Sequence, residues 1–300
     1  MKISERLVDW GYWLGWNVLW TLPESISRFL FDVLARTTWR LHGRGVRQLE
    51  LNLSRVTGQD PHSEEIRTLS RQALRSYMRY YCETFTMPKW TTEELNNRVR
   101  VENCEPVRQA LTSGGVILTL PHSGNWDHAG AWSALHFGSL CTVAERLRPE
   151  GVFQKFLKMR TDRGITLMPL TGEGGTYEYL RDNLNKGKVV ALLGDRDVAK
   201  NGMGNQFFGH RASLPIGAAL LAIDTGRPLF TCSSWYDGRT MVITFDQQIP
   251  VAPEHVTGRD RLRKAQEISA LVASNFERHL AAHPENWHQL QPVWSDLVAT

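Results

Sequence analysis

Short apolar runs alternate with longer amphipathic stretches over the second half of the chain. The runs are rich in aliphatic and β-branched residues and predict strands at residues 115–120, 139–145, 166–170 and 189–193. Periodic apolar positions between them predict helices at about residues 126–137, 152–163 and 175–185. This alternation predicts an α/β fold with a mostly parallel central sheet flanked by helices.

In the last third of the chain, two consecutive strands are predicted between helices, in place of the strict alternation of strand and helix. A helix should end at Gly226, and two strand-like runs at 228–236 and 239–245 follow it. The Asp237-Gly238 pair between these runs favours a hairpin. A long amphipathic pattern over residues 259–283 predicts a final helix.

The first hundred residues predict helices. Pro23 interrupts the apolar pattern, which then begins again, and Ser63 can cap a helix over residues 63–85. No repeat or low-complexity linker separates the two halves, so we expect the helical region to pack on the α/β part. We therefore expect one domain over 1–300, with a helical, membrane-associated part at 1–110 and a catalytic part at 111–300.

Composition narrows the class of protein. The chain has 300 residues, 42% of them apolar, with a formal net charge of +4 and a pI of about 8.9. This mild basic excess suits an anionic membrane surface or acidic substrates and is too weak to indicate nucleic-acid binding. The four cysteines form no CxxC pair, which argues against a disulfide framework and favours the reducing cytoplasm.

The N-terminus is unusually rich in tryptophan. Four of the eleven tryptophans lie in the first twenty residues: Trp10, Trp13, Trp16 and Trp20. Basic residues surround this apolar stretch, with Lys2 and Arg6 inside it and five arginines from Arg28 to Arg47 after it. The cluster could belong to a core, but its composition also suits a helix that lies in a membrane interface. The segment lacks the pattern of a secretory signal, and no apolar stretch is long enough to predict a spanning helix.

A histidine follows the predicted strand at 115–120, at the edge where open α/β sheets place ligand sites. Asp127 lies five positions after His122, which on a continuous helix would turn the two side chains about 140° apart. They can meet only if His122 lies in a turn over residues 123–125 and the helix begins near Trp126. A carboxylate that fixes the imidazole tautomer would leave the other nitrogen as a general base.

Other interpretations of these residues stay open. His122 could be a structural histidine and Asp127 a first-turn helix carboxylate. A metal site would use His122, Asp127 and His128, but no ligand pattern such as HExxH lies nearby, so we expect no metal. The glycine-rich residues 171–176 carry no GxGxxG and no Walker lysine, so we expect a loop there.

Four blocks in order resemble the lysophospholipid acyltransferase superfamily, whose first motif is a histidine, four residues and an acid. HSGNWD, which begins at His122, matches that motif, and the second block includes Arg160. The third block spans 192–230, and NWHQLQPVW at 286–294 resembles the branch that includes the lipid A late acyltransferases. Within this superfamily the chain most resembles actinobacterial phosphatidylinositol mannoside acyltransferases.

The resemblance implies a reaction and a set of catalytic groups. A fatty acyl group, typically palmitoyl, would pass from acyl-CoA to the 6-hydroxyl of a mannose on phosphatidylinositol mannoside. His122 would be the general base, with Asp127 or Asp195 orienting and stabilising it. Asp195 stands where that branch usually has glutamate, which keeps the charge and shortens the side chain by one methylene.

The resemblance also implies substrate-binding residues. Glu145 and Arg160 match positions near the sugar end of the site, and the oxyanion donor could be Arg196 or the backbone amides of residues 123–125. Acyl-CoA would be a co-substrate, and no cofactor or metal is expected. The expected partners are acyl-CoA, a mannosylated phosphatidylinositol lipid and an anionic membrane surface, with the protein peripheral on the cytoplasmic face of the plasma membrane.

Two other functions use the same residues differently. A thioesterase or lipid hydrolase would direct water, instead of a sugar hydroxyl, to the acyl group through the same histidine. A non-catalytic peripheral membrane adaptor would not need His122. The dependence of acyl consumption on the acceptor separates the first from a transferase, and substitution of His122 separates the second.

Overall fold

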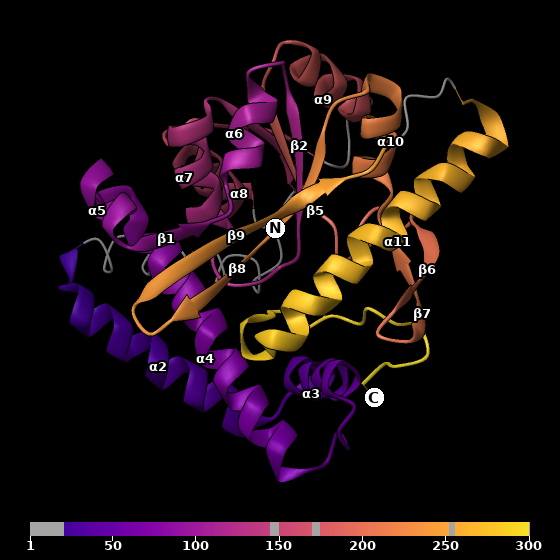
Figure 1. The fold of residues 1–300 in the computed structure, drawn as a ribbon. Helices are drawn as coiled ribbons and strands as arrows, with labels where there is room; N and C mark the ends of the chain where they lie inside the picture. Colours follow the sequence, from indigo (N-terminus) through magenta and orange to yellow (C-terminus); the bar gives the residue numbers. More distant parts are fainter. Residues whose placement is uncertain (1–20, 145–149, 170–174, 252–255, 300) are drawn as a thin grey trace.

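The protein is described by a computed structural model over residues 21–144, 150–169, 175–251 and 256–299 (Figure 1). Seven strands form one sheet in the order β1-β9-β8-β2-β5-β3-β4. Their bounds are β1 (Val99–Glu102), β2 (Val116–Leu120), β3 (Leu140–Ala144), β4 (Ile165–Pro169), β5 (Val189–Leu193), β8 (Leu229–Asp237) and β9 (Thr240–Ile249). The pairings are parallel except for β8 with β9. The predicted fold class is confirmed.

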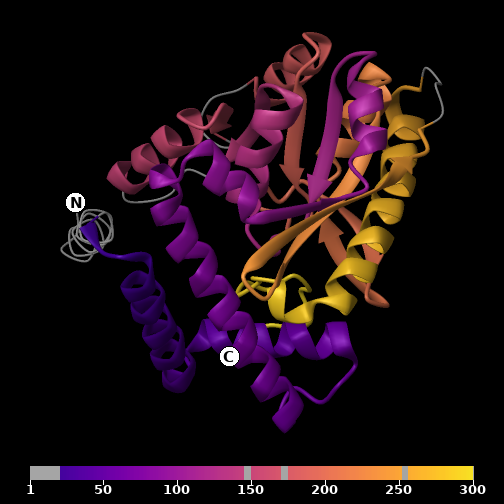
Figure 2. The ribbon, with the colours of Figure 1, turned by 60° about the vertical axis from the view of Figure 1, so that its left-hand side comes forward.

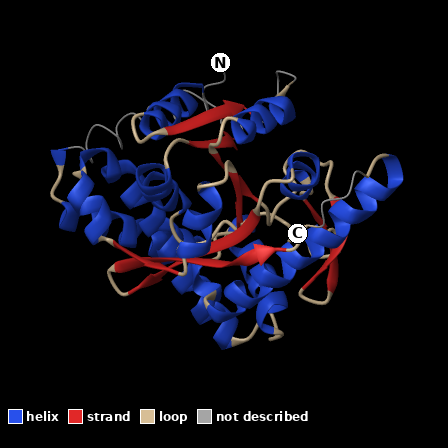
Figure 3. Ribbon diagram, turned by 45° about the horizontal axis from the view of Figure 1, so that its top comes forward, coloured by secondary structure: helices blue, strands red, loops and turns tan. Residues whose placement is uncertain are grey.

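Helices cover both faces of this sheet (Figure 3). They are α2 (Glu24–Leu41), α3 (Arg44–Thr57), α4 (Glu64–Thr86), α5 (Thr92–Asn97), α6 (Glu105–Leu111), α7 (Trp126–Phe137), α8 (Glu150–Thr161), α9 (Thr176–Asn185), α10 (Gly217–Thr225) and α11 (Gly258–Ala282). Two short 3₁₀ turns are η1 (Met87–Lys89) and η2 (Pro284–Asn286). Among these, α7 begins and ends where the apolar pattern predicts.

Strand β2 shows why two cores form. All five of its residues are buried, and successive side chains of a strand point to opposite faces. Val116, Leu118 and Leu120 pack into the core that includes Trp132 of α7. Ile117 packs into the other core, with Phe276 of α11. Burial on both faces explains why every position of this strand except Thr119 is apolar.

The hairpin predicted at Asp237-Gly238 joins β8 and β9. Asp237 pairs with Thr240, which leaves Gly238 and Arg239 as the two turn residues. Gly238 has a φ of 57°, a conformation that glycine adopts without steric cost. The hairpin is therefore confirmed, and it is the reason that β9 runs against its neighbour.

Three short strands were not predicted. β6 (Met203–Phe207) and β7 (His210–Leu214) form a separate antiparallel pair, and β1 adds an edge to the main sheet beside β9. β6 and β7 mix polar and charged residues and contain no β-branched residue, so their patterns resemble loops, whereas the alternating pattern of β1 is only four residues long. Because β1 pairs with β9, the expected helical part at 1–110 also supplies one strand of the sheet.

The N-terminal helices lie beside the C-terminal segment (Figure 2). Helix α4 begins at the predicted cap, where the Ser63 side chain accepts the Ile66 backbone N–H. In α3, the buried Asn52 side chain donates to the backbone carbonyls of Gln289 and Gln291. These bonds hold the segment that follows α11 against the helical region. The tryptophan cluster at Trp10, Trp13, Trp16 and Trp20 lies outside the described residues.

Candidate active site

Two neighbouring parallel strands deliver the central residues of the site. Leu120 at the end of β2 pairs with Leu193 at the end of β5. His122 and Asp195 each lie two positions beyond these paired residues, so the register brings them to the same point on the sheet edge. Gly194 permits this close approach, because a Cβ there would lie 2.6 Å from the Thr119 hydroxyl oxygen.

Asp195 holds His122 by two contacts. The Nδ1 atom of His122 lies 2.6 Å from Oδ1 of Asp195, and the His122 backbone N–H donates to Oδ2 at 3.1 Å. Of the two carboxylates that the sequence left open, Asp195 is therefore the one that contacts the imidazole directly. The aspartate side chain, though one methylene shorter than glutamate, reaches it fully.

The Asp195 carboxylate is fully buried and yet charged. Burial opposes the charge, but attraction to His122 and hydrogen bonds from His122 and Trp287 outweigh burial and lower the pKa of Asp195. A carboxylate on Nδ1 fixes that nitrogen as the one that carries the proton. Nε2 of His122 is then the nitrogen available to accept a proton, on a side chain that is 19% exposed.

The turn after His122 is built as the sequence predicts. Helix α7 begins at Trp126, and the Asn125 side chain caps it by accepting the His128 backbone N–H at 2.9 Å. Gly124 has a φ of 58°, and a Cβ there would lie 2.6 Å from the Ser234 carbonyl group. Both conditions require glycine, so this turn holds His122 off the helix, as predicted.

Asp127 has a different set of partners from Asp195. Its Oδ1 accepts from Nε of Arg160 at 2.6 Å, and its Oδ2 accepts from the Tyr80 hydroxyl at 2.8 Å. Burial and the Asp127 charge raise the pKa of Tyr80 well above its ordinary value, so the phenol stays a neutral donor. Asp127 and Arg160 are thus brought together in a buried ion pair that Tyr80 completes.

Aromatic contacts connect this ion pair to the histidine. Tyr80 stacks on Trp126 with ring centroids 4.0 Å apart, and Trp126 meets His122 edge-on at 5.3 Å. Asp127 therefore stabilises the aromatic residues that pack beside His122 and does not contact the imidazole itself. Sequence reasoning predicted a helix over residues 63–85 and assigned no role to Tyr80, so this residue was missed.

His128 points away from His122. It is buried, and its Nε2 lies 3.0 Å from the Leu95 carbonyl oxygen; burial lowers its pKa. The three residues of the metal interpretation therefore do not converge. Over the ranges that the structure describes, no group of three or more histidine, cysteine, aspartate or glutamate side chains is placed to hold a metal ion.

The remaining predicted residues are partly placed. Arg196 directly follows Asp195 and is half-buried, whereas Glu145 and residues 171–174 lie outside the described residues. Two of the proposed oxyanion amides are already engaged: Ser123 N–H donates to the Pro121 carbonyl, and Gly124 N–H to that of Asn286. This corrects the expectation for the Ser123 and Gly124 amides, while the roles of the Asn125 amide and the Arg196 side chain stay predictions.

The closing tryptophan block contributes residues that sequence reasoning did not assign. Trp287 donates its indole N–H to Oδ2 of Asp195 at 2.8 Å, and the His288 backbone N–H donates to the His122 carbonyl at 2.9 Å. Burial, followed by the charge of His122, lowers the pKa of His288 to about 3. The only signal for these residues in the sequence was their place in a motif.

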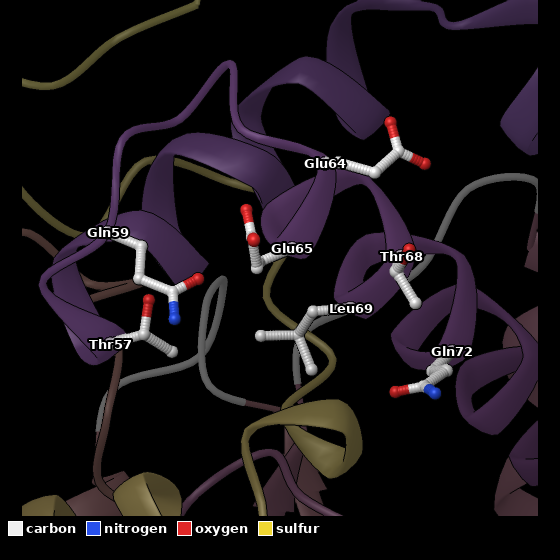
Figure 4. Close-up of a pocket in the computed structure, with 7 residues that line it drawn as sticks. All are labelled: Thr57, Gln59, Glu64, Glu65, Thr68, Leu69 and Gln72. Atoms are coloured by element: carbon white, nitrogen blue, oxygen red, sulfur yellow. The ribbon is translucent and has the colours of Figure 1, made fainter.

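A separate pocket of about 410 Å³ lies between the end of α3 and the start of α4 (Figure 4). Its lining combines polar and acidic side chains with one leucine: Thr57, Gln59, Glu64, Glu65, Thr68, Leu69 and Gln72. None of these belongs to the predicted site. The lining holds no cationic side chain, and its two carboxylates, Glu64 and Glu65, lie on α4 and not at His122.

Comparison with known proteins assigns the class. A family model described as bacterial lipid A biosynthesis acyltransferase matches residues 1–296. The chain therefore belongs to this family and is an acyltransferase.

Two curated relatives narrow the resemblance. The phosphatidylinositol mannoside acyltransferase of Mycolicibacterium smegmatis is 34% identical over 296 residues, covering 98% of this chain and 93% of the relative. The protein of the same name from Mycobacterium tuberculosis is 36% identical over 297 residues, covering 98% of this chain and 90% of the relative. The resemblance drawn from the four sequence blocks is confirmed.

A solved structure was also matched. The crystal structure of the 1-acyl-sn-glycerophosphate acyltransferase PlsC from Thermotoga maritima aligns with a TM-score of 0.39 at 14% identity. The alignment covers 86% of this chain and 98% of the other.

Proposed function

We propose that the protein transfers a palmitoyl group from acyl-CoA to the 6-hydroxyl of a mannose on phosphatidylinositol mannoside. The observation that carries this proposal is the buried Asp195 carboxylate 2.6 Å from Nδ1 of His122. The pair lies just beyond the carboxyl ends of β2 and β5, in a member of an acyltransferase family. The names of the relatives support the acceptor. The pairing supports general-base catalysis, because it fixes the tautomer and leaves Nε2 free of a proton.

The chain's own groups account for the proton in this reaction. Nε2 of His122 takes the proton of the sugar hydroxyl as its oxygen forms a bond to the thioester carbonyl carbon. The tetrahedral intermediate then expels the CoA sulfur, and the imidazolium returns the proton to it. Asp195 stabilises the imidazolium between these steps, and Arg196 is the proposed donor to the oxyanion.

The sugar end of the acceptor would lie near Arg160. Its guanidinium is held by Asp127, and that pairing outweighs burial and raises the pKa of Arg160 above its ordinary range. The group is therefore a permanent cation at a fixed place, and it presents hydrogen-bond donors. We propose that Arg160 and Glu145 bind the polar part of the acceptor.

We further propose that the protein attaches peripherally to the anionic cytoplasmic face of the membrane. A palmitoyl chain of about 14 methylenes is worth roughly 11 kcal/mol on leaving water, so it must stay in an apolar environment during transfer. Within the described ranges, no helix combines the length and apolar character needed to span a bilayer. We propose attachment through an exposed apolar surface.

Helix α2 offers such a surface among the described residues. Its exposed apolar side chains recur at helical spacing: Ile26, Phe29, Leu30, Val33, Leu34 and Leu41. The opposite side packs on α4, where Phe31 contacts Phe85, and Arg98 fixes the first turn through Glu24. Arg40 in the last turn adds a basic group, which suits anionic lipid.

Vesicle binding tests this surface. Phe29 and Leu34 are 65% and 49% exposed, so replacing both with serine should lose about 2 kcal/mol, or roughly 30-fold in partitioning. The matched control replaces Leu262 and Leu271 of α11, which are 43% and 47% exposed, with serine. Equal co-sedimentation of both double variants with anionic vesicles would reject α2 as the attachment surface.

Product analysis tests the reaction. Purified protein should convert palmitoyl-CoA and a mannosylated phosphatidylinositol into a lipid heavier by one palmitoyl group, with little free palmitate. Release of free palmitate at the same rate with and without acceptor would indicate a thioesterase or lipid hydrolase. An absence of both products would favour a non-catalytic adaptor.

A further inference from the structure

In the proposed mechanism, Oδ1 of Asp195 contacts the His122 imidazole, and Oδ2 has no assigned role. Oδ2 accepts two hydrogen bonds, from the His122 backbone N–H at 3.1 Å and from the Trp287 indole N–H at 2.8 Å. The indole N–H is a donor only, and here it meets a buried charge. Trp287 is itself fully buried, so water does not compete for this bond.

Trp287 is fixed from both sides along the chain. Ser123 and Trp287 form an isolated antiparallel β-bridge. On one side, Gly124 N–H donates to the Asn286 carbonyl, and on the other, His288 N–H donates to the His122 carbonyl. The backbone that carries the indole is therefore tied directly to the turn that carries His122. A movement of one relative to the other would break both bonds.

The indole ring is packed as firmly as its backbone. It meets Phe207 and Trp294 edge-on, with ring centroids 6.3 and 6.1 Å away. An aspartate side chain has no such restraint of its own, because rotation of its carboxylate about χ2 is broad and roughly two-fold. Two donors on Oδ2 define the plane of the carboxylate, and Oδ1 then lies toward Nδ1 of His122.

We propose that Trp287 is a positioning residue of the acyl-transfer reaction, whose indole N–H sets the plane of the Asp195 carboxylate against His122. This inference rests on the proposed function. Trp287 touches neither substrate in this account and acts only through Asp195. It should therefore affect the rate of the chemical step and leave the binding of both substrates unchanged.

Two replacements at Trp287 and one matched control test the inference. Trp287→Phe removes the donor, and the benzothiophene analogue of tryptophan removes it while keeping the shape of the ring, so a failure of the first to fold would not end the test. Trp294→Phe is the control. Trp294 is also fully buried, it donates its indole N–H to the Phe207 backbone carbonyl and not to Asp195, and phenylalanine keeps an aromatic ring at the position that packs on Trp287.

We expect both Trp287 replacements to lower kcat at least about 10-fold, the rate equivalent of one lost charge-assisted hydrogen bond. KM for palmitoyl-CoA and for the acceptor should change less than about two-fold. Trp294→Phe should lower thermal stability and leave kcat within about two-fold. Equal kcat for wild type and the benzothiophene variant would overturn the inference.

A double-mutant cycle distinguishes positioning from a general structural effect. In an Asp195→Ala background there is no carboxylate to orient, so Trp287→Phe should cause no further loss beyond about two-fold. Additive losses would overturn the inference. If the wild type makes no acylated glycolipid, the proposed function fails instead.

A spectroscopic comparison then tests Trp287 without substrate. The hydrogen-bonded Nδ1–H proton of His122 should give an NMR resonance that is lost in Trp287→Phe and kept in Trp294→Phe. Its persistence in the Trp287 variants would refute the positioning role.

Discussion

Replacing Asp195 with asparagine would place an NH₂ donor among groups that themselves donate hydrogen bonds. All three groups that contact the carboxylate are donors in the active state: Nδ1–H and the backbone N–H of His122, and the indole N–H of Trp287. Asparagine has one acceptor oxygen and one NH₂ group. The NH₂ must then face either the imidazole alone or the two donors on the other side.

The cheaper arrangement turns the amide NH₂ toward the imidazole, because it leaves only one donor to adapt. His122 can adapt by moving its proton from Nδ1 to Nε2, which removes the lone pair that would accept the sugar proton. The variant also lacks the charge that stabilises the imidazolium. General-base catalysis contributes about 10²–10⁴-fold, so kcat should fall at least about 10²-fold.

The assay is kcat for glycolipid acylation with both substrates saturating. Asp195→Glu keeps the charge and should lose less activity than Asp195→Asn. Asp246→Asn is a matched control, because Asp246 is a largely buried carboxylate bonded to another histidine, His279. An asparagine variant at position 195 with wild-type kcat would refute the assigned role of the carboxylate.

Three further predictions concern the surroundings of the pair. Asp127→Asn should lower the free energy of unfolding in urea by about 3 kcal/mol, because it breaks the buried pair with Arg160, and should lower kcat less than Asp195→Asn; the reverse order of kcat would contradict this. His128→Ala should lower the melting temperature without changing kcat per folded molecule, since its imidazole contacts the Leu95 carbonyl and the Trp90 ring and not His122. Burial and the charge of His122 lower the pKa of His288 to about 3, so between about pH 3 and 6.5 the unfolded chain binds a proton that the folded chain does not. The free energy of unfolding should therefore rise with pH over this range. His288→Gln should flatten the rise between about pH 5 and 6.5, and an unchanged slope would reject this.

Much of the fold follows from local patterns. β2 and β5 are short apolar runs because both faces of each strand are covered, and α7 begins where Asn125 can cap it. β6 and β7 escape prediction because only alternate positions are buried and the buried ones include small and polar side chains. Their strand character comes from pairing with each other across a turn.

The site was only partly predictable for a related reason. His122 stands out because it follows a strand, but the choice between Asp127 and Asp195 depends on which strand lies beside β2 and in what register. Trp287 reaches Asp195 from 92 positions along the chain, and no local pattern encodes that contact. Residues that are far apart in the sequence become neighbours only when the chain folds.

The central claim is that His122 is the base that activates the sugar hydroxyl. The most direct measurement is the rate of glycolipid acylation by His122→Ala, together with its affinity for palmitoyl-CoA by calorimetry. We predict a fall in kcat of at least about 10²-fold with the acyl-CoA affinity nearly unchanged, since that affinity comes mainly from the chain and the CoA moiety. Near wild-type turnover by His122→Ala, or loss of turnover in His128→Ala instead, would contradict the account.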